Sequence, residues 1–103
     1  MKPSILASLA ARIITAYDAS QAVGDKEVGD WPLGTGEAIS VWQESEGRQG
    51  LFRLYGDERN GRVPYADAVI KWEAFRADPA KVLGDFLDGA RERLGELRSE
   101  TGR

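Results

Sequence analysis

Residues Glu37 to Tyr55 read EAISVWQESEGRQGLFRLY, and the rest of the chain is organised around them. Apolar and polar residues alternate in both halves of this stretch, which is typical of strands with one buried face, so it predicts a β-hairpin. If Val41 lies opposite Leu54, the residues left at the tip form a four-residue turn, Glu46-Gly47-Arg48-Gln49.

This register gives the hairpin two different faces. The apolar face consists of Ile39, Val41, Phe52 and Leu54. On the other face, Trp42 lies opposite Arg53 and Ser40 lies opposite Tyr55. Two hypotheses follow for this second face: another element covers it, or it serves as a binding platform.

Helical patterns flank the hairpin at both ends of the chain. Apolar residues recur at spacings of three and four in the N-terminal part, which predicts an amphipathic helix over about 4–22. Asp78 suits the N-cap and Pro79 the first position of a second helix, over about 79–98. The last residues, 99–103, are expected to fray.

Two segments between these elements need a separate interpretation. Residues 23–36 are rich in glycine and charge and predict a loop, in which Trp31 either covers one end of the core or anchors a partner. Residues 68–76 fit a strand that turns Ile70, Trp72 and Ala74 inward, or a short helix. We prefer the strand, because a two-stranded ribbon alone is only marginally stable.

The predicted fold class is α+β: a two-layer domain with a three-stranded antiparallel sheet and the N- and C-terminal helices packed on one face, in the order α-β-β-β-α. A chain of 103 residues, 42% of them hydrophobic, is long enough for one domain, 1–103, and too short for two separate cores. The predicted elements are helix 4–22, loop 23–36, strands 37–44, 50–56 and 68–76, helix 79–98 and tail 99–103.

The composition excludes several chemistries. The chain has no cysteine and no histidine, which excludes disulfides, thiolate or histidine metal sites, and the Ser-His and Cys-His catalytic arrangements. The acids Asp57 and Glu58 lie in a predicted turn, where adjacent carboxylates usually face water, so they do not indicate a hydrolase. We therefore expect a non-enzymatic protein with no cofactor and no metal.

The charge distribution bears on the partner class. The formal net charge is −3, and only residues 47–76 are basic, with six bases against four acids. Such a balance does not favour bulk nucleic-acid binding, which needs a strongly basic domain. No apolar run is long enough to span a membrane, so we expect a soluble, cytoplasmic protein.

Two surfaces are candidates for binding. The first is the second face of the hairpin, with Trp42, Arg53 and Tyr55, where Trp42 and Arg53 could also simply form a cross-strand cation–π pair. The second is a line of acids on the last predicted helix, here called the acidic ridge. It consists of Asp85, Asp88, Glu92, Glu96 and Glu100.

The function expected from these features is that of a small acidic protein-binding module with a larger partner that carries a basic surface. In size and character the chain is similar to the stoichiometric inhibitors carried by phages and mobile elements, including anti-CRISPR proteins. The alternatives are weak binding of single-stranded nucleic acid through Trp42, Arg53 and Tyr55, and a homodimer that hides Trp42.

Overall fold

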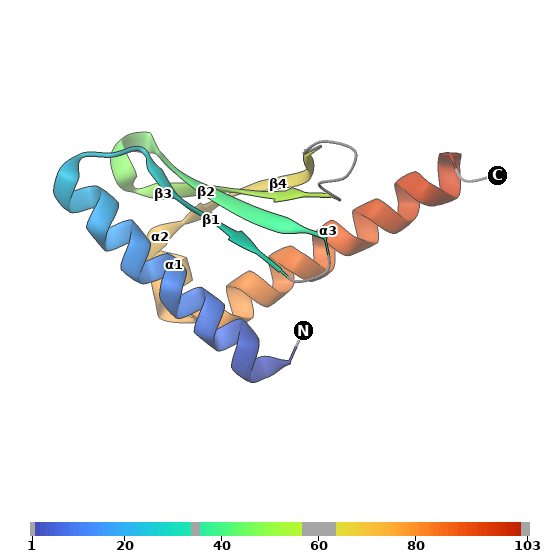
Figure 1. Cartoon of the computed structure of the whole chain (residues 1–103), viewed down its shortest axis with the longest axis horizontal. Coiled ribbons are helices and arrows are strands. Elements are labelled where there is room, and N and C mark those ends of the chain that lie inside the picture. The colour runs from blue at the N-terminus through green and yellow to red at the C-terminus, as the bar shows by residue number, and fades with distance from the viewer. Residues whose placement is uncertain (1, 34–35, 57–63, 102–103) are drawn as a thin grey trace.

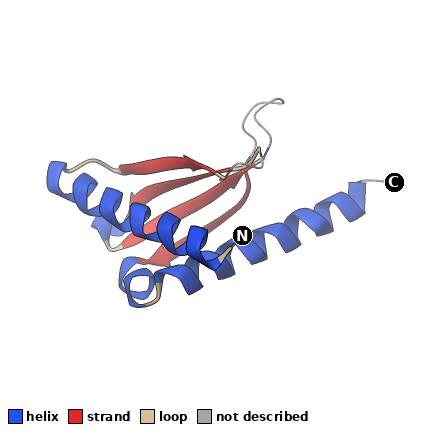
Figure 2. Cartoon of the chain, turned by 60° about the horizontal axis from the view of Figure 1, so that its bottom comes forward, coloured by secondary structure: helices blue, strands red, loops and turns tan. Residues whose placement is uncertain are grey.

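The structure is a computed structural model that describes residues 2–33, 36–56 and 64–101, and the side chains of 2–33, 36–56 and 66–92. Its four strands form one antiparallel sheet in the order β1-β2-β3-β4. The two long helices lie on the same side of this sheet (Figures 1 and 2). The elements are α1 (Pro3–Val23), β1 (Glu27–Pro32), β2 (Ala38–Glu44), β3 (Gln49–Tyr55), β4 (Pro64–Lys71), α2 (Trp72–Ala77) and α3 (Pro79–Thr101).

The α+β class, the antiparallel sheet and the helices at both ends are confirmed, but the sheet has four strands where three were predicted. The end of α3 projects beyond the sheet (Figure 1). Within the described part of the chain, neither long helix has a window of residues apolar enough to cross a membrane.

The strand that the sequence did not reveal is β1, which lies within the predicted loop 23–36. It pairs with β2 through an irregularity between Glu27 and Gly29, and this irregularity breaks the two-residue period that marks a strand. Gly29 itself is required by packing, because a Cβ atom there would lie 2.7 Å from Cη2 of Trp31. Glycine signals a loop in a sequence, whereas here it lets an aromatic ring cover the strand.

The hairpin pairs in a register two residues away from the predicted one. Ile39 lies opposite Leu54 and Val41 lies opposite Phe52, so the turn consists of residues 45–48. At the tip, Ser45 and Glu46 adopt positive φ angles of 51° and 59°, a conformation that non-glycine residues seldom take. Because the shift is an even number of residues, every side chain keeps its predicted face. Ile39, Val41, Phe52 and Leu54 are all fully buried.

The predicted strand 68–76 proves to be two elements. Strand β4 ends at Lys71, and α2 begins at Trp72, whose backbone N–H donates to the Arg48 carbonyl at 3.1 Å. Trp72 is only 3% exposed, but Ala74, which was expected to point inward, is exposed. At this turn the Trp72 ring lies directly over Gly50 of β3.

The core lies between the sheet and the helices and is centred on Trp72. The ring centroids of Tyr17 and Trp72 are 3.9 Å apart, and those of Phe52 and Trp72 are 5.8 Å apart. Phe75 adds an edge-on contact to Trp72 with centroids 5.7 Å apart. These contacts join α1, β3 and α2 around one indole ring. Phe86 of α3 packs against Phe52, with centroids 6.0 Å apart.

The contact between the Trp72 ring and Gly50 can be tested by substitution. A Cβ atom at position 50 would lie 2.8 Å from the Trp72 ring and 2.9 Å from that of Phe52, and neither rigid ring can yield cheaply. Gly50→Ala should lower the free energy of unfolding by about 1–3 kcal/mol. The matched control is Gly89→Ala in α3, where a Cβ atom meets nothing within 4 Å, and which should raise stability by about 0.5–1 kcal/mol.

Urea unfolding followed by circular dichroism measures both variants on one scale. Equal stability of Gly50→Ala and the native chain would show that the Trp72 ring is not seated on β3.

Candidate functional site

The outer face of the sheet is turned away from the helices (Figure 2). It carries a row of apolar side chains. Trp42 lies opposite Leu51, and Leu51 lies opposite Val69, so the three side chains cross β2, β3 and β4 in line. Opposing side chains in such a ladder are direct neighbours, about 4.5–5.5 Å apart at Cβ. We call Trp42, Leu51 and Val69 the apolar row. Trp42 is 37% exposed and Val69 56% exposed.

Charged and polar side chains flank the apolar row on both sides. On one side Arg53 lies between Ser40 and Asp67 and forms an ion pair with Asp67, with Nη2 and Oδ2 3.7 Å apart. The strand pairing places four acids and two bases on this face, which gives a net charge of −2 among the described residues. These are Glu27, Asp30, Glu44 and Asp67, with Arg53 and Lys71.

Three predicted site residues lie on this face, but the register separates two that were expected to pair. Trp42 lies opposite Leu51, one step along the ladder from Arg53, so the predicted Trp42–Arg53 cross-strand pairing is wrong. Tyr55 lies opposite Ala38, at the far end of the face. Sequence reasoning missed Leu51 and Val69. Alternation alone places Leu51 on this face, whereas Val69 could be placed only by knowing how β4 pairs with β3.

The acidic ridge is present in part on α3. Asp85, Asp88 and Glu92 are exposed, whereas Glu96 and Glu100 lie outside the described side chains. The Lys81 ammonium donates to the Asp85 carboxylate at 3.0 Å, and this hydrogen bond, together with the carboxylate charge, raises the pKa of Lys81 above 10.5. Lys81 is therefore charged at neutral pH and compensates Asp85.

Trp31 lies on β1 and not on a loop. Its ring is half-buried, lies over Gly29 and packs against the core cluster. Of the two interpretations of Trp31, this position favours a cover for one edge of the core over an anchor for a partner.

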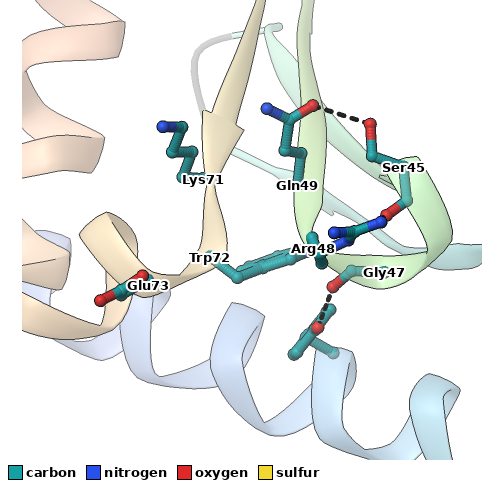
Figure 3. A pocket seen from close by; sticks show the side chains of 8 residues that line it. Ser45, Gly47, Arg48, Gln49, Lys71, Trp72 and Glu73 are labelled. Carbon is teal, nitrogen blue, oxygen red and sulfur yellow. Dashed lines mark hydrogen bonds between the residues drawn. The ribbon is translucent and has the colours of Figure 1, made fainter.

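A pocket of about 610 Å³ opens at the end of the sheet where the hairpin turn meets α1 and α2 (Figure 3). Its polar groups do not converge: the Arg48 guanidinium lies on one side of the Trp72 ring, and the Lys71 ammonium and Glu73 carboxylate lie on the other (Figure 3). A small-molecule site needs a few polar groups aimed at one ligand, so this arrangement is poorly suited to one. The lining residues are Tyr17, Ser45, Gly47, Arg48, Gln49, Lys71, Trp72 and Glu73.

Hydrogen bonds beneath this pocket hold the hairpin turn to α1. The Tyr17 hydroxyl donates to the Gly47 carbonyl, and the Gln21 amide donates to Gln43 Oε1 at 3.0 Å. The Gln43 amide in turn donates to Ser20 Oγ at 2.6 Å. These polar groups are therefore engaged in fixing the turn, which gives them a structural role.

Within the described residues, no three acidic side chains lie close enough together to hold a metal ion. No known protein family, no curated protein and no solved structure matches the chain.

Comparing substitutions of Trp72 and Trp42 tests whether the apolar row is needed for the stability of the fold. Trp72→Ala should cost about 3–5 kcal/mol, because it empties the centre of the core. Trp42→Ala should cost only about 1 kcal/mol or less, because its ring lies on the outer face, is 37% exposed and is not part of the core cluster. Thermal and urea unfolding followed by far-UV circular dichroism measure both. Similar losses for the two variants would mean that Trp42 is part of the core.

Proposed function

We propose that this chain is a small non-enzymatic protein-binding module, and that the outer sheet face is its working surface. The apolar row carries the proposal, because it places two exposed apolar side chains, Trp42 and Val69, on a face that no described helix covers. An apolar centre surrounded by charged and polar side chains is the usual anatomy of a protein–protein interface. Tryptophan is also the residue that most often dominates binding energy there.

The charge of the face supports a protein partner over single-stranded nucleic acid. Phosphate backbones require a surplus of cations, whereas four acids and two bases lie on this face. One of the two bases, Arg53, is already paired with Asp67. Base stacking also uses several exposed aromatic rings, and on this face Tyr55 is half-buried and separated from Trp42.

The acidic ridge supports the same partner class in a secondary role. Asp88 and Glu92 are exposed on α3, so the ridge and the outer face are both acidic in balance. A partner with a basic surface suits both. Exposed charges mainly speed association and make it depend on salt, whereas apolar contacts set the lifetime of the complex. We infer that the module acts stoichiometrically, as an inhibitor does, by occupying a surface of the larger partner.

The experiment that tests this proposal is quantitative affinity capture from extracts of the organism that encodes the chain. The native chain is compared with Trp42→Ala/Val69→Ser, which removes the exposed part of the apolar row. Ile5→Ser is the matched control, because Ile5 is 53% exposed on α1, on the other side of the sheet. We expect the double variant to lose a specific partner by about tenfold or more and Ile5→Ser to retain it.

The ridge and the nucleic-acid alternative are tested beside it. Asp88→Lys/Glu92→Lys should weaken capture by only a few-fold and flatten its salt dependence. Titration of the native chain with mixed single-stranded oligonucleotides at low salt should leave the tryptophan fluorescence unchanged. Full capture by Trp42→Ala/Val69→Ser would remove the outer face from the proposal, and quenching by oligonucleotides would favour the nucleic-acid alternative.

A further inference from the structure

Strand β4 forms one edge of the sheet, since only β3 pairs with it among the described strands. An edge strand presents unpaired backbone N–H and C=O groups along one side and can pair with another strand. We propose that two copies of this chain pair through β4, antiparallel to each other, about a two-fold axis at Val69. The result is a continuous eight-stranded sheet.

The side chains of β4 fit this pairing. In an antiparallel ladder centred on Val69, Asp67 of each copy lies opposite Lys71 of the other, which makes two ion pairs related by the axis. Asp67, Val69 and Lys71 are all exposed and lie on the outer face. Asp67 already pairs with Arg53 of its own chain, so in the dimer its carboxylate lies between two cations. A two-fold interface must be self-complementary, and an acid, an apolar residue and a base at equal spacing meet that requirement.

The half-buried side chains on the inner face fit the same register. Ala68 of one copy lies opposite Ile70 of the other, and both residues are incompletely covered within one chain. Every pair from 67 to 71 is therefore either apolar with apolar or acid with base. The ladder ends at Lys71 because the chain leaves the sheet at Trp72 to form α2.

Neighbouring registers lack this complementarity. Centring the ladder on Asp67 or on Lys71 opposes two like charges on the axis, which is destabilising. Centring it on Ala68 or on Ile70 places Val69 opposite a charged residue, Asp67 or Lys71 respectively. The sequence of β4 thus selects one register, which is a sign of specific pairing.

The proposed dimer also extends the outer face. Val69 ends the apolar row of one copy, and in the dimer it lies beside Val69 of the second copy. The two rows then join into one line of six apolar side chains across the eight-stranded sheet. The dimer does not rest on the proposed function, because the purified chain alone is sufficient to test it.

The first test uses the absence of cysteine from the chain. Residues that face each other across a ladder have Cα atoms about 4.5–5.5 Å apart, within the range that a disulfide spans. Val69→Cys should therefore form a covalent dimer under mild oxidation. The control is Val23→Cys at the end of α1, which is more exposed, 78% against 56%, and so should crosslink faster if collisions were random. We expect at least tenfold faster crosslinking of Val69→Cys.

The second test reverses charges and follows the mass by sedimentation over a concentration series. Lys71→Asp and Asp67→Lys should each weaken the dimer by about tenfold or more, because both ion pairs become repulsions. The double variant Asp67→Lys/Lys71→Asp should restore it. Circular dichroism of each variant verifies the fold, and the rescue by the double variant distinguishes pairing from misfolding.

Three outcomes would overturn the proposal. They are a native chain that stays monomeric up to about millimolar concentration, equal crosslinking rates for the two cysteine variants, and a dimer that ignores the charge reversals but is lost in Trp42→Ala. The last outcome would assign the dimer to pairing of the outer faces. Val69 belongs to both the apolar row and the β4 edge, whereas Trp42 lies on β2, away from that edge. Capture by the single variant Trp42→Ala therefore tests the proposed function independently of the dimer.

Discussion

The contact of the Trp72 ring with Gly50 and Tyr17 is the interaction on which the rest of the structure depends. It lies where β4 becomes α2, and it holds the sheet, the first helix and the segment before the last helix against one ring. The indole N–H is buried without an acceptor among the described residues, which costs about 1–3 kcal/mol. Burial of about 150–250 Å² of ring surface contributes about 4–6 kcal/mol and outweighs that cost.

Both long helices lie on the same face of the sheet, and no described helix covers the other face. Once α1 and α3 lie on the inner face, the outer face keeps its apolar row, including the exposed Trp42 and Val69. Charged side chains on both sides keep that row narrow. In the strand order β1-β2-β3-β4, β4 lies at an edge of the sheet. Val69 of β4 therefore lies where the proposed second copy extends the sheet.

Much of this architecture could be predicted from the sequence, and the exceptions have physical causes. Both long helices, the hairpin and the inner face of its strands followed from periodicity and from Asp78 and Pro79. The β1 strand was not predicted, because Gly29 reads as a loop residue in the sequence, whereas here it makes room for the Trp31 ring. The register of the hairpin was not predicted correctly, because Ser45 and Glu46 at its turn take left-handed conformations that no local preference indicates. For the candidate site, alternation placed Trp42 on the outer face, but its neighbours depend on pairing between strands distant in sequence.

The central claim is that one face of the sheet is sealed around Trp72 and the other is open at Trp42. Oxidative footprinting of the native chain, read by mass spectrometry at each of the three tryptophans, tests it most directly. We expect Trp42 to be modified fastest, Trp31 more slowly, and Trp72 only under conditions that unfold the chain. Modification of Trp72 as fast as Trp42 in the folded protein would contradict the claim, because the core and the open face would then be indistinguishable to solvent.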